Sequence, residues 1–365
     1  MGGDATVSKQ VSLGVVLSAA VWVVLPSWTA AQAPSVEEPT AAFQARGAAE
    51  AEAWRQGARP ALIDLLRLDR IQPWTGPEEQ RVTLGEPEDL GTYTRADGRI
   101  WTEPDIQVPF WYLRPKGPGP FPVAVLPHGH DQIGRNTYAG IARDQQHADK
   151  IRREDRDVAV QAVEKGFVAI APVVRGFGEL GLPASLGRAD STCVSLWHHQ
   201  LLRGRVLTGA RVWDVMRILD WALDLPDTDP DRVLVMGNSG GGMVTSFAAA
   251  CDPRITVAVA SCSFCSLVGV RGQMHHHPCN IIPGMSRFGE FWDVHGLIAP
   301  RWLLLVHGQN DPLFPIEEVE RSVEQVRRIY AISGADDRFD HRWGSAGHRF
   351  YKDLMWPFID AAMAR

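Results

Sequence analysis

The chain has 365 residues, of which 45% are hydrophobic, and a formal net charge of −6. This length and apolar content are sufficient for a large buried core, in one extended α/β domain or in two domains. The basic residues are dispersed along an acidic chain, so the composition gives no indication of a nucleic-acid partner.

Residues 1–33 have the pattern of a secretory signal peptide. Lys9 gives a weakly basic start, residues 11–25 are apolar, and Pro26 ends the apolar run. Small residues at 29–33 offer a cleavage site. The apolar run has 15 residues, fewer than the roughly 20 that span a bilayer. We therefore expect a secreted or periplasmic protein without stable membrane insertion after cleavage; an uncleaved membrane anchor is the alternative.

The remaining chain is predicted to have an extension at residues 34–106 and a catalytic core at 107–365. The extension begins with helices within 41–69 and continues with early strands. In the core, apolar strands alternate with amphipathic helices, which is typical of a mostly parallel sheet covered by helices on both faces. The predicted strands are 80–84, 108–113, 123–126, 168–173, 232–236, 256–260, 302–306 and 339–343. The predicted helices are 152–165, 206–223, 243–250, 316–329 and 349–363.

Two long segments, 176–203 and 261–294, interrupt this alternation. Insertions of this length in a compact fold usually act as lids or binding loops. Both follow core strands, so we expect them to overhang the active site and to determine substrate choice.

A glycine-flanked serine follows the apolar strand 232–236. The sequence there is Gly237-Asn238-Ser239-Gly240-Gly241, and a helix-forming stretch comes next. A serine on a sharp strand-to-helix turn has a strained backbone, and the residues two before and two after it must be very small for strand and helix to pack closely. This pattern predicts that Ser239 is a nucleophile.

The residues needed to activate Ser239 follow in order. Asp311 comes just after the strand at 302–306, and His348 lies in a glycine-containing turn near the C-terminus. In such a triad the histidine takes the serine proton while the acid orients the imidazole. Asp252 and Asp293 are alternative acids, but neither follows a core strand so directly. We therefore predict the triad Ser239, Asp311 and His348.

An oxyanion hole requires preorganised N–H donors. One is expected to be the backbone N–H of Gly240, immediately after the nucleophile. The other is expected from the loop after the strand at 123–126, which reads Pro-His-Gly-His-Asp from residue 127. There we assign the backbone N–H of His130.

With these motifs in view, the chain resembles the α/β-hydrolase superfamily. Segments 126–130, 175–178, 276–284 and 297–301 resemble its acetyl xylan esterase-like and dienelactone hydrolase-like branch. The resemblance covers roughly residue 107 to the C-terminus and implies hydrolysis of carboxylic esters, often acetyl groups on plant polysaccharides, without a cofactor. True dienelactone hydrolases use a cysteine nucleophile, whereas position 239 is a serine. The resemblance therefore favours an ordinary serine esterase.

Four residues outside the triad are candidates for substrate binding. Arg175 follows the strand at 168–173, and Trp197 and Trp292 could stack on a sugar ring. His276 could border the substrate pocket. Each has a structural alternative: an ion pair for Arg175, coverage of the core for the tryptophans, and loop packing for the histidine.

The run His275-His276-His277-Pro278-Cys279 could suggest a metal site. Adjacent histidines in an extended loop point in different directions, and the sequence shows no second half-site at metal-binding spacing. We therefore expect no metal. The five cysteines leave at least one unpaired and permit up to two disulfides, whose connectivity the sequence does not reveal.

The sequence thus favours an exported serine esterase that acts on an acyl or methyl ester of a carbohydrate or small molecule. One alternative is a peptidase of the prolyl oligopeptidase type, although the roughly 100 residues before the core are too few for the propeller of about 40 residues per blade that such enzymes normally carry. A non-catalytic binding protein on the same scaffold is a second alternative. The acyl group, the alcohol and the oligomeric state stay open.

Overall fold

The structure is a computed structural model that describes residues 1–2, 38–182, 192–269, 272–273 and 276–364. Most of the predicted signal peptide lies outside these residues. Within them, no helix combines the length and the apolar character needed to cross a membrane.

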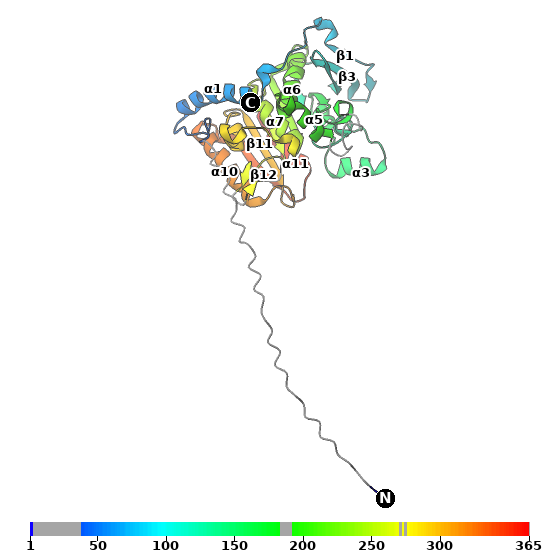
Figure 1. Cartoon of the computed structure of the whole chain (residues 1–365). Coiled ribbons are helices and arrows are strands. Elements are labelled where there is room, and N and C mark those ends of the chain that lie inside the picture. The colour runs from blue at the N-terminus through cyan, green and yellow to red at the C-terminus, as the bar shows by residue number, and fades with distance from the viewer. Residues whose placement is uncertain (3–37, 183–191, 270–271, 274–275, 365) are drawn as a thin grey trace. The chain divides into compact units, whose positions relative to one another are not determined.

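A ten-stranded sheet forms the centre of the described chain (Figure 1). Its strand order is β1-β3-β4-β6-β5-β7-β8-β11-β12, and β2 pairs with β3. The strands from β6 to β12 in this order run parallel, whereas β1 to β4 pair antiparallel. The strands are β1 Val82–Leu84, β2 Glu88–Asp89, β3 Tyr93–Glu103, β4 Ile106–Pro115, β5 Phe121–Val125, β6 Val168–Pro172, β7 Thr228–Asn238, β8 Val257–Ser261, β11 Trp302–Gly308 and β12 Phe339–Gly344.

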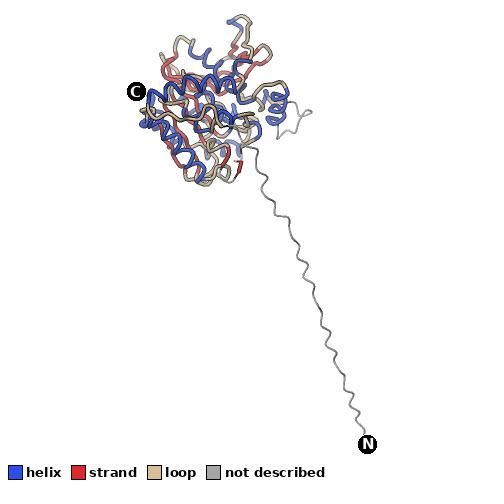
Figure 2. Tube along the Cα trace, turned by 60° about the vertical axis from the view of Figure 1, so that its left-hand side comes forward, coloured by secondary structure: helices blue, strands red, loops and turns tan. Residues whose placement is uncertain are grey.

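Helices cover both faces of this sheet, as Figure 2 shows. Alternate strand residues point to opposite faces: Val233 and Val235 pack with α1, α6, α7, α9 and α10, whereas Leu234 and Met236 pack with α4 and α11. The helices are α1 Ala48–Leu65, α2 Gly134–Tyr138, α3 Gln145–Arg153, α4 Val158–Glu164, α5 Thr192–Leu202, α6 Leu207–Leu223, α7 Gly240–Cys251, α8 Met285–Phe288, α9 Phe291–Gly296, α10 Ile316–Ile332 and α11 Lys352–Met363. The predicted fold class is confirmed.

Two predicted features differ from the structure. The long segments contain helices α5, α8 and α9 and the small ribbon of β9 (Val268–Gly269) and β10 (Gly272–Gln273). The single helix predicted at 152–165 is two helices, α3 and α4, because Asp155 adopts a left-handed backbone with φ 52°. The buried Asp155 carboxylate accepts a hydrogen bond from the Arg349 guanidinium, so a long-range contact interrupts the helix.

Candidate active site

Ser239 occupies the turn between β7 and α7. Its backbone has φ 58° and ψ −124°, a conformation that non-glycine residues rarely adopt. The Ser239 N–H donates to the Ser261 carbonyl at 2.8 Å, which attaches the turn to the end of β8. The strained turn predicted from the glycine pattern is present.

The glycines around Ser239 are required by close backbone contacts. A Cβ at Gly237 would lie 2.4 Å from the carbonyl carbon of Gly241, so strand and helix meet at these two positions. A Cβ at Gly241 would lie 2.0 Å from the Pro127 carbonyl oxygen. The residues two before and two after the serine therefore leave no room for a side chain.

The substitution Gly241→Ala tests this packing. The new methyl group must displace the Pro127 backbone, so we expect the free energy of unfolding to fall by about 3 kcal/mol and ester hydrolysis to weaken. Gly57→Ala is the matched control: Gly57 is an exposed residue of α1 with no atom near its added Cβ, and helix propensity predicts a gain of about 0.5–1 kcal/mol. Urea denaturation of both variants measures the two effects; equal stabilities would contradict the packing argument.

Asp311 and His348 meet after β11 and β12. The Nδ1 of His348 donates to Oδ2 of Asp311 at 2.7 Å, and Oδ1 of Asp311 accepts from the Leu313 N–H at 3.0 Å. Asp311 is buried. With its proton on Nδ1, the neutral His348 ring has Nε2 available as an acceptor, which is the state that a general base requires.

Both alternative acids have other partners. Asp252 pairs with Arg254 at 2.7 Å. Asp293 accepts hydrogen bonds from the N–H groups of Glu290 and Phe43. Asp311 is therefore the acid that contacts His348.

A cavity of about 350 Å³ lies between the predicted nucleophile and the predicted base. Ser239, Gly240 and His348 line it, together with Gly129 and His130. The Phe314 ring, which also lines the cavity, stacks parallel to the His348 imidazole with ring centroids 6.2 Å apart. The predicted nucleophile and base thus share one cavity.

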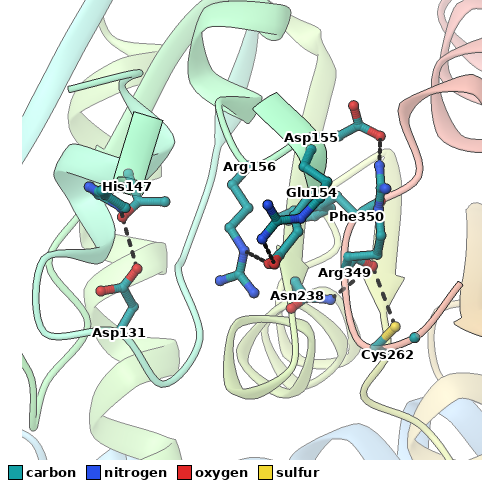
Figure 3. A network of polar contacts seen from close by, with 12 residues as sticks. Asp131, His147, Glu154, Asp155, Arg156, Asn238, Cys262, Arg349 and Phe350 are labelled. Atoms are coloured by element: carbon teal, nitrogen blue, oxygen red, sulfur yellow. Dashed lines mark hydrogen bonds and ion pairs between the residues drawn. The ribbon is translucent and has the colours of Figure 1, made fainter. Parts of the chain in front are cut away.

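A polar network joins the nucleophile turn to the histidine turn (Figure 3). The Arg349 carbonyl accepts from Nδ2 of Asn238 at 3.4 Å and from the thiol of Cys262 at 3.5 Å. The hydroxyl of Ser261 also donates to it, at 3.2 Å. Because Asn238 precedes Ser239 and Arg349 follows His348, these bonds fix the two turns relative to each other.

The loop after β5 lies directly against the nucleophile turn. A Cβ at Gly129 would be 2.7 Å from the Asn238 carbonyl oxygen and 3.1 Å from Cβ of Ser239. The His130 ring lies beside Gly240, where an added Cβ would come within 3.1 Å of it. The backbones of the loop and of Gly240 therefore border the same side of Ser239.

His128 anchors this loop from beneath. Its Nε2 accepts from the Val174 N–H at 3.0 Å, and its Nδ1 donates to the Gly129 carbonyl at 2.8 Å. Burial lowers the pKa of His128 to about 4, so the ring is neutral at physiological pH.

This neutrality has a consequence for stability. The pKa of His128 is lower in the folded chain than its ordinary value of 6.5, so protonation favours the unfolded chain as the pH falls from 6.5 towards 4. We expect a loss of about 2 kcal/mol from this residue between pH 7 and pH 4.5. Buried His295, whose pKa burial also lowers to about 4, acts in the same direction. Urea denaturation at both pH values should show a smaller loss for His128→Asn than for the unaltered chain; equal losses would contradict the assignment.

Comparisons with known proteins agree with this architecture. A model of the prolyl oligopeptidase family matches residues 196–353, which include Ser239, Asp311 and His348. The candidate hydrolase YtaP of Bacillus subtilis (strain 168) is 28% identical over 246 residues, which are 66% of this chain and 78% of that protein.

Solved structures show the same fold. A candidate acetyl xylan esterase from Bacteroides fragilis NCTC 9343 superposes with a TM-score of 0.68 at 20% identity, over 88% of this chain and 80% of that one. A glucuronoyl esterase from Solibacter usitatus superposes with a TM-score of 0.60 at 15% identity, over 92% and 99% of the two chains. The chain has the α/β-hydrolase fold.

One of the four residues proposed for substrate binding lines the cavity. His276 does so, and its Nε2 lies 3.3 Å from the Ser266 carbonyl oxygen. Trp197 instead donates from Nε1 to the Ile281 carbonyl at 3.0 Å. Trp292 packs on the core beside Arg321, whose guanidinium carbon lies 5.5 Å from the ring centroid. The two tryptophans cover the interior at these positions and do not line the cavity.

Arg175 also lies outside the cavity, in a buried ionic cluster. Its guanidinium donates to both carboxylate oxygens of Asp214, at 2.6 and 2.5 Å, and pairs with Glu103. Burial alone would lower the pKa of Arg175, but the two carboxylates outweigh it and raise the pKa. Arg175 therefore forms a structural ion pair, the alternative to substrate binding that the sequence left open.

Several cavity residues were not predicted individually, although Ser263 belongs to segment 261–294, which was expected to overhang the active site. Tyr138 comes from α2, Arg156 from the break between α3 and α4, and Ser263 from the segment after β8. The buried Ser263 hydroxyl has no hydrogen-bond partner among the described residues. These residues are distant from the triad in sequence, and only the folded chain brings them together.

A second cavity of about 480 Å³ adjoins the first and shares residues with it. Arg156 lines both cavities, and its Nε donates to Glu154 at 2.6 Å. The remaining wall is rich in cationic and polar side chains, among them Arg143, His147 and Lys150.

All five cysteines are buried, unpaired thiols, so the structure contains neither of the two disulfides that the sequence permits. Cys279 lies beside Arg211, whose two terminal nitrogens are each 3.5 Å from Sγ. The second half-site that the sequence did not show is also present: the ligand atoms of His277 and Cys279 meet those of His130 and Cys193 within 4.8 Å of one another. Sequence spacing missed this group because its members come from three distant segments.

Proposed function

We propose that this hydrolase is an exported serine carboxylic-ester hydrolase. One observation carries the proposal. Ser239, on a positive-φ turn, opens into the same cavity as His348, whose Nδ1 is 2.7 Å from the buried Asp311 carboxylate. A strained serine, a neutral histidine acceptor and a buried acid are the requirements for forming an acyl-enzyme.

In the proposed mechanism, Ser239 Oγ attacks the ester carbonyl while Nε2 of His348 takes the hydroxyl proton. Asp311 keeps the imidazole in the useful tautomer and stabilises the imidazolium. The backbone N–H groups of Gly240 and His130 stabilise the oxyanion, each contributing about 3 kcal/mol. His348 then protonates the leaving alcohol, and water hydrolyses the acyl-enzyme by the reverse sequence of proton transfers.

The proposed substrate is an ester of a carbohydrate, with a small acyl or methyl group. Structural neighbours include a candidate acetyl xylan esterase, a methylesterase and a glucuronoyl esterase. The catalytic cavity of about 350 Å³ has room for an acyl group and part of a sugar. The adjoining cavity, with Arg143, Lys150 and Arg156, could hydrogen-bond the hydroxyl or carboxylate groups of further sugar units.

Export is proposed from the N-terminal pattern of a basic residue, an apolar run and small residues at 29–33. A polysaccharide ester would be met outside the cytoplasm, which agrees with that pattern.

A peptidase of the prolyl oligopeptidase type is the second candidate, because the family model that matches residues 196–353 has that description. Its acyl-enzyme chemistry would use the same three residues. The two candidates differ in the leaving group, an alcohol for the esterase and an amine for the peptidase.

The test is a substrate panel for the purified chain. It comprises p-nitrophenyl acetate, butyrate and octanoate, acetylated xylan, a methyl ester of glucuronic acid and a proline-containing peptide amide. We expect cleavage of the short esters and of one carbohydrate ester. Release of acetate from xylan identifies an acetylesterase, whereas release of methanol from the glucuronate identifies a uronate esterase. Cleavage of the peptide amide alone would replace the esterase proposal with the peptidase.

A further inference from the structure

We propose that His130, Cys193, His277 and Cys279 form a zinc site beside the catalytic cavity. The four residues come from the loop after β5, from α5 and from the segment before α8. One potential ligand atom from each lies within 4.8 Å of all the others. Two imidazoles and two thiols at one point are the ligand set of a tetrahedral structural zinc site.

The spacing of the ligand atoms fits this ion. Sγ of Cys279 lies 3.3 Å from Nε2 of His130 and 3.2 Å from Nδ1 of His277. Zinc–sulfur bonds of about 2.3 Å and zinc–nitrogen bonds of about 2.0 Å imply about 3.5 Å between nitrogen and sulfur ligands in a tetrahedron. The side chains therefore need to move apart by only a few tenths of an ångström to admit the ion.

The charges around the cluster also suit a zinc ion held by two thiolates. Two thiolates neutralise the two positive charges of zinc, so the site as a whole is uncharged. Arg211 then donates from its two terminal nitrogens to Sγ of Cys279, each at 3.5 Å. Its position is fixed by further bonds to the Arg175 carbonyl and to Oδ1 of Asn280. Such outer hydrogen bonds to a ligand sulfur hold it in place for the metal.

The site would have a structural role next to the catalytic serine. Four protein ligands complete the tetrahedron and leave no position for substrate. His130 and His277 line the catalytic cavity, and the His130 ring touches Gly240. The ion would connect α5 and the segment around His277 to the loop that carries the proposed oxyanion donor. It would thereby hold the cavity wall and that N–H in position.

The experiment measures zinc in the full-length chain without an affinity tag, so that no added histidines contribute. We expect about one zinc per chain by mass spectrometry of the metals, and zinc content below a tenth of that value in Cys193→Ser, Cys279→Ser and His277→Gln. Cys251→Ser is the control, because Cys251 is a buried thiol in α7 that does not belong to the cluster; it should retain the zinc.

Cobalt(II) provides a readout that does not depend on the variants folding. After zinc is removed from the unaltered chain with a chelator, added Co²⁺ should give the strong visible bands of a tetrahedral ion and a thiolate-to-metal charge-transfer band. A thiol assay on the denatured chain separates the alternatives. Five reactive thiols without bound metal would overturn the proposal in favour of a hydrogen-bonded cluster, and three would overturn it in favour of a Cys193–Cys279 disulfide.

The link to catalysis is measured separately. Zinc removal should lower kcat for p-nitrophenyl acetate at least tenfold with little change in KM, and added Zn²⁺ should restore it. This second readout rests on the proposed esterase function, whereas zinc content and the cobalt spectrum do not, so failure of one proposal is distinguishable from failure of the other. Full activity of the zinc-free chain would overturn the positioning role.

Discussion

Replacing Ser239 by alanine is expected to lower kcat for ester hydrolysis by about 10⁶-fold, on the scale found when the nucleophile of another Ser-His-Asp enzyme is removed. The oxygen that would form the acyl-enzyme is lost, while Gly240, His348 and the cavity stay in place. KM should change little, because the substrate contacts other than Oγ are preserved. Initial rates with p-nitrophenyl acetate measure the effect.

Two further measurements make the Ser239→Ala result specific. A fluorophosphonate probe, which reacts with activated serines, should label the unaltered chain once and leave the variant unlabelled. Ser286→Ala, at an exposed serine of α8, is the matched control and should retain both labelling and rate. If Ser239→Ala kept more than about a hundredth of the activity, a different nucleophile would be responsible and the proposed mechanism would be wrong.

Asp311→Asn should lower kcat by about 10⁴-fold without disturbing the fold. The asparagine keeps the shape of the side chain but offers an NH₂ group where Oδ2 now accepts the Nδ1 proton of His348 at 2.7 Å. The imidazole would then take the other tautomer, with its proton on Nε2, and could not accept the proton of Ser239. The effect should appear in kcat, because proton transfer belongs to the chemical step.

The matched control for Asp311→Asn is Asp231→Asn, at an exposed position of β7, which should have unchanged kinetics. A thermal unfolding midpoint close to that of the unaltered chain would show that the Asp311 variant is folded. Undiminished kcat in Asp311→Asn would mean that His348 is oriented by another group, and the acid would have to be reassigned.

The parallel half of the sheet was predictable from sequence because its strands are continuous apolar runs. Strands buried on both faces, such as β8 and β11, can be recognised in the sequence as apolar runs without knowledge of the strands beside them. The turn at Ser239 was predictable for a different reason: it depends on close backbone contacts that only glycine permits, and glycine is visible in the sequence.

β3 gave no such signal. Its residues are mostly polar, with Gly98 in the middle, and buried positions are interspersed with half-buried ones. A Cβ at Gly98 would lie 2.5 Å from the Phe110 ring of β4. The glycine therefore serves a cross-strand contact and does not mark a turn. The need for a glycine at this position depends on a side chain of the partner strand, so the sequence of β3 alone does not reveal it.

Specific side-chain roles were the least predictable part of the site. Arg175 lies just after a core strand, as a site residue would, but its side chain turns into the interior towards Asp214 and Glu103. Arg156 enters the cavity only because Asp155 breaks the helix beside it. Position along the chain predicts where a backbone passes, whereas the direction of a long side chain depends on where its opposite charges lie.

The ionic cluster of Arg175 also determines how far the chain can be shortened. The sequence resemblance to the α/β-hydrolase superfamily starts near residue 107, yet Glu103 lies before that point and shares Arg175 with Asp214 of α6. β3 forms one side of the antiparallel hairpin whose other strand is β4. A fragment that began at residue 107 would lose a carboxylate from the interior and expose the backbone edge of β4 to other chains. The smallest piece that folds as a monomer therefore begins well before the segment that carries the recognisable motifs.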